Sequence, residues 1–169
     1  MKGQLQVRFG LCQSGWIRRH ISDGTQEVTL WCTHFEDPLP KLLTWLEALA
    51  GGLDRCGWTL DEETDRVELN AYVRWMISEV RLDVRPLNDL RLDGVIPLRP
   101  TLRFDLPLPD LIGRFYDAFL EFVTSDRYQP EEWSRSAGQG IYDGLDWAAW
   151  RSAPVEAWLA SQRKHGTFI

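Results

Sequence analysis

The stretch PDLIGRFYDAFLEFVTSD, residues 109–126, decides the fold, because the chain changes there from alternating apolar patterns to helical ones. Apolar residues recur in it every three or four positions, so they share one broad face of a helix. These residues are Leu111, Ile112, Phe115, Tyr116, Phe119, Leu120 and Val123. Upstream of this helix we predict strands with one helix among them, and downstream mainly helices.

The first thirty-five residues predict three strands. Apolar side chains alternate from Leu5 to Leu11, a second strand covers 15–21, and the return strand spans 26–35. The pair Asp23-Gly24 between the last two is typical of a tight hairpin. The return strand carries apolar residues on both faces, so we expect it to be central in its sheet.

The segment DPLPKLLTWLEALAGG, residues 37–52, predicts a helix over about 38–50, with Asp37 as N-cap and glycines at its end. Alternation then predicts a hairpin of strands over 56–60 and 67–73. Two further strands are expected over 80–84 and 102–106, and the proline-rich residues 86–100 form an irregular connection.

Short helices are expected in the remainder, starting at Pro130, at Asp143 or Gly144, and at Pro154. The predicted fold class is therefore α+β: a mostly antiparallel sheet of about five to seven strands, an early helix at about 38–50 and a helical C-terminal region. We assign residues 1–169 to a single domain, strand-rich over 1–106 and helix-rich over 107–169. The C-terminal helices either pack on the sheet or form a small lobe of their own.

The chain has 169 residues and a net charge of −6, with no basic tail or stripe. Nucleic acid and anionic membranes are therefore disfavoured as partners. The N-terminal residues lack the apolar stretch of a signal peptide, and no apolar run has the length of a membrane span. Three widely spaced cysteines suit reduced thiols, so we expect a cytoplasmic protein.

No residue set completes a catalytic, metal or cofactor site. Cys32 and His34 point to one strand face, but zinc needs further ligands at suitable spacing. Dyads of Cys12 or Cys32 with His20 are conceivable across adjacent strands, without a supporting motif. We therefore assign no catalytic, cofactor-binding or metal-binding residues and expect no cofactor.

Two features are candidates for binding a protein partner. The first is the acidic turn of Asp61, Glu62, Glu63 and Asp65, which is either a solvated hairpin tip or a patch that attracts a basic partner. The second is part of the set of nine tryptophans. Trp158 is expected to be a core anchor on the last helix. Trp133, Trp147 and Trp150 are the candidates for an exposed contact surface, since tryptophan is enriched at binding hot spots.

In small size, acidity, reduced thiols and overall architecture, most of the chain resembles bacterial immunity proteins, which bind and neutralise a cognate toxin. The resemblance implies a non-enzymatic protein-binding module that occludes the toxin, whose surface is expected to be basic. Two alternatives stay open. One is a small enzyme with a site assembled from distant His, Asp, Glu and Arg residues, and the other is a homo-oligomeric structural subunit.

Overall fold

The computed structural model describes residues 4–13, 16–33, 38–61, 66–87, 100–134 and 146–164. Within these residues the predicted α+β class is confirmed. The elements are, in chain order, β1 (Gln6–Gln13), β2 (Trp16–Ser22), β3 (Glu27–Thr33), α1 (Pro38–Ala50), β4 (Arg55–Asp61), β5 (Arg66–Arg74), the 3₁₀ turn η2 (Trp75–Ile77), β6 (Glu79–Leu87), β7 (Leu102–Pro107), α2 (Leu108–Val123), α3 (Pro130–Ser134) and α4 (Ala153–Lys164).

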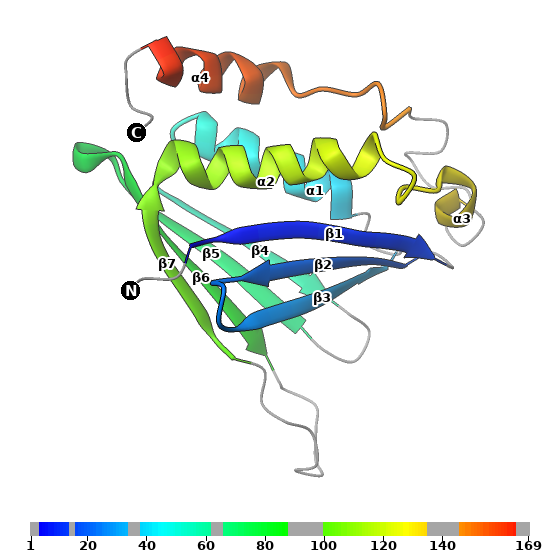
Figure 1. Ribbon diagram of the computed structural model, residues 1–169. Helices are drawn as coiled ribbons and strands as arrows, with labels where there is room; N and C mark the ends of the chain where they lie inside the picture. Colours follow the sequence, from blue (N-terminus) through cyan, green and yellow to red (C-terminus); the bar gives the residue numbers. More distant parts are fainter. Residues whose placement is uncertain are drawn as a thin grey trace.

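The described strands form two antiparallel sheets, of order β1-β2-β3 and β4-β5-β6-β7. The expected hairpins are present: β2 returns as β3 through Asp23, whose carboxylate accepts backbone hydrogen bonds from Thr25 and Gln26. The apolar sides of the two sheets face each other, while α1 and α2 lie across the space between them (Figure 1). Each sheet therefore keeps one side towards solvent.

The prediction that the third strand is central was wrong, because β3 ends the three-stranded sheet and β2 is its middle strand. The apolar residue on the outer side of β3 has another explanation. The guanidinium carbon of Arg18 lies 4.1 Å from the ring centre of Trp31, and the ring of Trp16 contacts the same indole edge-on at 6.1 Å. A cross-strand aromatic and cationic cluster thus covers Trp31 without a further strand.

Helix α2 joins the layers through its aromatic residues. Phe122 stacks on Phe9 of β1 with ring centres 5.1 Å apart, and Phe115 meets Trp45 of α1 edge-on at 5.3 Å. Trp45 in turn lies 6.3 Å from Trp58 of β4. Helix α2 therefore contacts the three-stranded sheet directly, and it contacts the four-stranded sheet both directly, at β6 and β7, and through α1.

The outer edge of β1 is covered by arginine side chains. Arg114 of α2 donates a hydrogen bond to the carbonyl of Leu5, and Arg127 donates one to the carbonyl of Phe9. The backbone N–H of Cys12 donates to the carbonyl of Arg127 at 2.9 Å. Backbone groups that an edge strand normally exposes are thus paired within the chain.

The C-terminal segment packs on helices, with α4 forming an outer layer over α2 and α1 (Figure 1). Trp147 is 4% exposed, and its ring and that of Trp150 both meet Phe119 edge-on, at 6.3 and 6.4 Å. A helix was expected to begin at residue 143 or 144. Among the residues that the structure describes, this segment contains only a single turn, residues 147–149, which is capped by Asp146. Trp158 is half-buried against the core, which agrees with its expected anchoring role.

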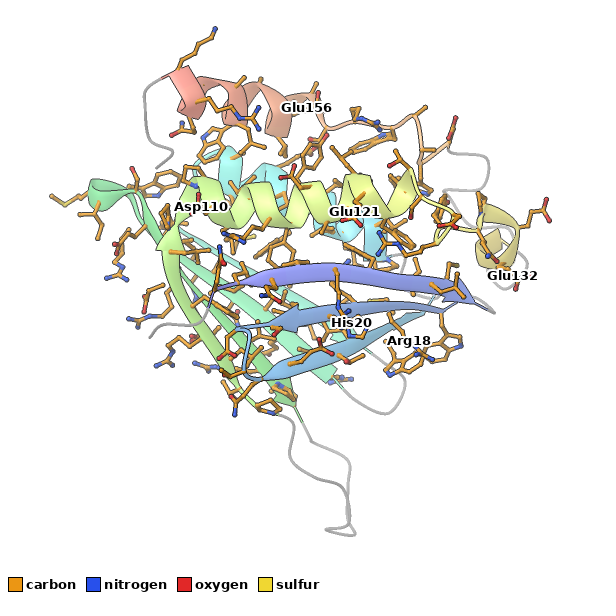
Figure 2. All side chains as sticks on the ribbon, in the orientation of Figure 1. Arg18, His20, Asp110, Glu121, Glu132 and Glu156 are labelled. Atoms are coloured by element: carbon orange, nitrogen blue, oxygen red, sulfur yellow. The ribbon has the colours of Figure 1, made fainter. Side chains whose placement is uncertain are left out.

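A hydrogen-bond network fixes the same segment to both long helices. The hydroxyl of Tyr116 donates to Glu156 and accepts the backbone N–H of Ser152, while the Ser152 hydroxyl donates to Glu47 at 2.6 Å. Burial, together with the bond to Glu156, raises the pKa of Tyr116 to about 12. Figure 2 shows Glu156 on the side of α4 that faces α2.

One charged residue, Arg19 of β2, lies at the centre of the core and is 0% exposed. Its guanidinium carbon is 4.5 Å from the ring centre of Phe9 and 4.5 Å from that of Trp58. Burial lowers its pKa to about 10, so it stays charged at neutral pH. Cation–π contacts in a dry site stabilise by about 2 kcal/mol each, whereas removal of an ion from water costs several kcal/mol. The rings therefore offset the cost of burial only in part.

The packing of Trp147 predicts a large effect on stability. We expect Trp147→Ala to lower the free energy of unfolding by about 3–5 kcal/mol, because the cavity left beside Phe119 cannot close. Urea unfolding followed by circular dichroism measures this change. Trp75→Ala is the matched control, since Trp75 is 42% exposed, and it should change stability by no more than about 0.5 kcal/mol. Equal losses in the two variants would contradict the core position of Trp147.

Candidate functional site

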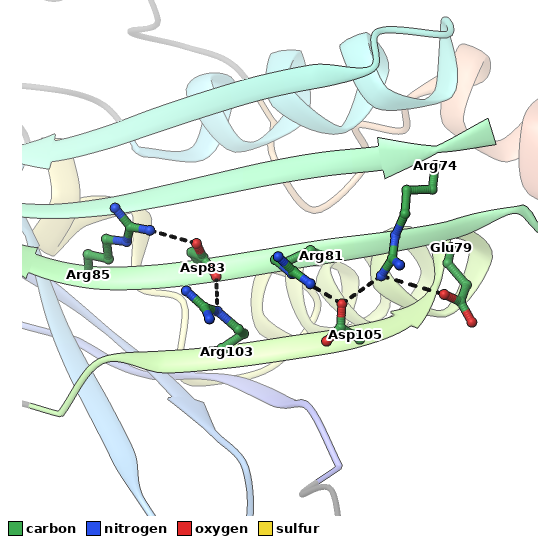
Figure 3. Close-up of polar contacts among 7 residues, drawn as sticks. All are labelled: Arg74, Glu79, Arg81, Asp83, Arg85, Arg103 and Asp105. Carbon is green, nitrogen blue, oxygen red and sulfur yellow. Dashed lines mark hydrogen bonds and ion pairs between the residues drawn. The ribbon is translucent and has the colours of Figure 1, made fainter.

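The outward side of the four-stranded sheet carries the candidate site. Charged side chains alternate along β6 and β7 with apolar residues of the core, so the charges all lie on the outward side of the sheet. The antiparallel register places Arg81 opposite Asp105 and Asp83 opposite Arg103. We call this surface the arginine face; it consists of Tyr72 and of the charged residues Arg74, Glu79, Arg81, Asp83, Arg85, Arg103 and Asp105. Figure 3 shows these charged residues.

Asp83 is the buried centre of the arginine face. Its two carboxylate oxygens accept hydrogen bonds from Arg85 and Arg103, both at 2.8 Å, and its side chain is only 3% exposed. Desolvation would raise the pKa of Asp83, but the hydrogen bonds and charges of Arg103 and Arg85 outweigh it and hold the pKa below its usual value. Asp83 is therefore ionised and fixes both guanidinium groups.

Asp105 forms the second centre. It accepts hydrogen bonds from Arg74 at 2.8 Å and from Arg81 at 3.3 Å, and Arg74 also pairs with Glu79 at 3.6 Å. Figure 3 shows the two centres side by side across β5, β6 and β7. Each aspartate is thus shared between two arginines, an arrangement that leaves cationic N–H groups directed towards solvent.

A shallow depression of about 410 Å³ lies on this face. Four arginines and one aspartate line it, together with Tyr72, whose ring lies 5.3 Å from the guanidinium carbon of Arg55. In a chain of net charge −6, this surface therefore has a local excess of positive charge. Planar guanidinium groups bind carboxylates and phosphates through paired hydrogen bonds, so the depression suits anionic groups.

An exposed apolar tip adjoins the arginine face. Strand β5 ends at Arg74, and η2 then turns the chain into β6 through Ser78, whose φ is 52°. We call Trp75, Met76 and Ile77 the hairpin tip; their exposed fractions are 42%, 101% and 57%. The tip extends beyond the start of α2 (Figure 1), where the N–H of Leu108 donates to the carbonyl of Ser78 at 2.9 Å. Its backbone is therefore anchored while its side chains are open to solvent.

The structure does not assemble the site residues predicted from the sequence. Asp61 ends β4, but its side chain and all of Glu62, Glu63 and Asp65 lie outside the described residues. The backbone of Trp133 belongs to α3, and its side chain is likewise outside them. The acidic turn and Trp133 therefore remain predictions.

The prediction that Trp147 belongs to an exposed contact surface was wrong. Its ring is 4% exposed, and the half-buried Trp150 contacts it at 5.8 Å between ring centres. Among the tryptophans whose side chains the structure describes, Trp75 is the exposed one. The physical reason is that Phe119 of α2 offers an apolar surface which nothing in the local sequence of the tail reveals.

The conceivable cysteine–histidine dyads do not form. Cys12 and Cys32 are buried on the inner side of the three-stranded sheet, whereas His20 points outward with Arg18 (Figure 2). His20 instead hydrogen-bonds Glu27 at 2.9 Å, which lowers the pKa of that carboxyl together with Arg8. Burial raises the pKa of the Cys12 thiol to about 11. The described residues contain no cluster of His, Cys, Asp and Glu suited to a metal, and His34 lies outside them.

Comparison of the chain with protein-family models, with curated proteins and with solved structures gave no match. Among the described helices, none is both long and apolar enough to cross a bilayer. The candidate site therefore stands on its own geometry.

The residues of the arginine face did leave a signal in the sequence. In RLDVR, residues 81–85, charges alternate with buried apolar residues, and LRFDL, residues 102–106, repeats the pattern. Alternation predicts that these charges share one side of a sheet. Which aspartate meets which arginine depends on strand order and register, which the local pattern does not contain.

The ion pairs of Asp83 predict a dependence of stability on pH. Its depressed pKa contributes stability that is fully present above the unfolded pKa of about 3.9 and is lost as the pH falls through the folded value. We expect Asp83→Asn to lower the free energy of unfolding at neutral pH by about 1–3 kcal/mol and to flatten its fall in acid. Urea unfolding between neutral and acid pH measures both effects. Asp117→Asn, at an exposed position of α2, should match the unaltered protein, and acid sensitivity unchanged in Asp83→Asn would contradict the assignment.

Proposed function

We propose that this protein is a non-enzymatic protein-binding module and that the arginine face and the hairpin tip form its contact surface. The observation that carries the proposal is the continuity of the two. Arg74 ends β5 inside the ion-pair network, and the exposed Trp75 follows it directly. A charged surface of fixed geometry is thereby joined to an apolar contact group.

The composition of this surface supports the proposal. Tryptophan, arginine and methionine are enriched in protein interfaces, and the strongest contacts centre on tryptophan and arginine. Scattered exposed apolar residues are ordinary on soluble proteins, but three consecutive ones at an anchored turn are not. Arginines already held by Asp83 and Asp105 lose less side-chain freedom when they meet a partner, which favours binding.

The charge of this surface indicates the charge of the partner. The acidic turn of the sequence suggests a basic partner, whereas the arginine face suits carboxylate groups on an acidic one. We favour an acidic contact region on the partner, because Asp83 and Asp105 hold the arginine side chains in place beside the exposed hairpin tip. The charge of the arginine face is opposite in sign to the net charge of the chain, which makes this face distinct from the remainder of the protein surface.

The resemblance to bacterial immunity proteins gives a narrower proposal, in which the partner is a toxin whose active site this surface occludes. Co-expression tests it: a toxin encoded beside this chain's gene should stop growth alone and permit growth when the chain is present. Trp75→Ala should abolish protection while the variant protein remains folded. Protection retained in that variant, or a neighbouring gene without toxicity, argues against the narrower proposal.

The binding proposal predicts that reversal of a charge on the arginine face weakens partner binding, whereas reversal of a charge elsewhere on the protein does not. We expect Arg85→Glu to weaken binding roughly tenfold or more, because the new carboxylate repels an acidic partner and disturbs Asp83. Lys164→Glu, at an exposed position at the end of α4, changes the net charge equally and should bind as the unaltered chain does. The measurement is tagged capture from the native lysate, followed by titration of the identified partner. Equal binding by the two variants would exclude the arginine face.

The alternative that the same surface binds a second copy of this chain is tested by the mass of the protein in solution. A homo-oligomer would appear in sedimentation equilibrium as a mass above 19.6 kDa. Dissociation of that oligomer by Trp75→Ala would assign the surface to a second copy of this chain and overturn the proposal of a different partner.

A further inference from the structure

Arg19 occupies an unusual place, because it is the middle residue of the inner side of the three-stranded sheet. The register sets it between Phe9 of β1 and Leu30 of β3, and Ile17 and Ile21 flank it along β2. All four neighbours are fully or almost fully buried, as is Arg19 itself. Apolar residues fill such positions in most sheets.

The guanidinium group of Arg19 lacks acceptors. In the part of the chain that the structure describes, Nε, Nη1 and Nη2 are all buried without a hydrogen-bond partner. The rings of Phe9 and Trp58 attract its charge, but they offer no oxygen or nitrogen acceptor to its five N–H bonds. Buried polar groups in proteins are normally hydrogen-bonded, so the unpaired donors of Arg19 call for an explanation.

A second unpaired donor lies beside the first. Nε1 of Trp58 is also buried without an acceptor, and the ring of Trp58 is the one that contacts Arg19. By contrast, Nε1 of the neighbouring Trp45 donates to the carbonyl of Cys56 at 3.2 Å. Two unpaired donors therefore meet at one indole ring.

The same indole borders a groove of about 300 Å³ between α1 and β4. Lys41, Thr44 and Trp45 of α1 line one wall, and Cys56, Gly57 and Trp58 of β4 line the other. Trp58 thus lines the groove and also contacts Arg19.

We propose that this groove is the entrance to a binding site for an apolar monocarboxylate, whose carboxylate pairs with Arg19 and whose hydrocarbon part lies against Trp45 and Trp58. The indole of Trp58 turns aside to admit the ligand. A single guanidinium balances one negative charge, and its paired N–H groups match the two oxygens of a carboxylate. A phosphate dianion would bring a second charge into the same apolar core, which favours the monocarboxylate. The site lies on the inner side of the sheets and does not depend on the proposed function of the arginine face.

The unpaired state of Arg19 is tested without ligand. We expect Arg19→Met to raise the Tm by at least about 2 °C, because the variant buries no charge and keeps most of the side-chain volume. Ile17→Met is the control on the same strand, and the altered packing there should leave the Tm unchanged or lower it. A lower Tm in Arg19→Met would show that the buried guanidinium already contributes net stability without a ligand, and would overturn the proposal.

Ligand binding is tested with octanoate and its uncharged match, octanol, by isothermal titration calorimetry. We expect octanoate to bind the unaltered protein at least about tenfold more tightly than octanol, the ratio that one charge-assisted hydrogen bond supplies. Arg19→Met should abolish the preference for the acid, and Arg18→Met, which removes a charge from the outward side of the same strand, should retain it. Absence of saturable octanoate binding, a preference that survives in Arg19→Met, or one that is lost in Arg18→Met would each overturn the proposal.

Discussion

Helix α2 has to cover two sheets at once, and the rest of the structure follows from that constraint. The helix contacts β1 of one sheet and β6 and β7 of the other, and its aromatic residues also pack against the neighbouring helix and the C-terminal segment. Phe122 stacks on β1, Phe115 contacts α1, and Phe119 receives the tryptophans of the C-terminal segment. Helix α1 then extends the apolar surface to the four-stranded sheet through Trp45 and Trp58. The wide apolar face of residues 109–126 thus contacts β1, α1 and the C-terminal segment. The outer side of each sheet carries polar residues.

The sequence predicted the local elements well, because periodicity is a local property. Helices α1 and α2 and all the strands follow from spacing, caps and turns. The partition of the strands into two sheets did not follow, since alternation shows which side of a strand is buried and not which strand lies next to it. The candidate site was missed for the same reason. Trp147 and Trp75 each stand in an apolar-rich stretch, and only the presence of Phe119 beside one of them decides which ring is buried. The pairing of Asp83 with Arg103, twenty residues apart, likewise depends on register.

Arginine has two opposite environments in this protein. On the arginine face, each aspartate holds two guanidinium groups at the surface, where water solvates the remaining N–H bonds. In the core, Arg19 has aromatic rings in place of carboxylates. The first environment stabilises the fold and orders a surface. The second destabilises the fold, and such residues persist in proteins mainly where function needs them.

The arginine side chains along β1 also affect how the protein behaves when many copies are present. An open strand edge can pair with the edge of another molecule, and repetition of that pairing leads to fibres. Arg114 and Arg127 take the carbonyls of Leu5 and Phe9, and the N–H of Cys12 is used as well. Stacking of molecules along β1 would require these bonds to break first. The chain therefore carries its own protection against aggregation at this edge, supplied by residues more than a hundred positions away in sequence.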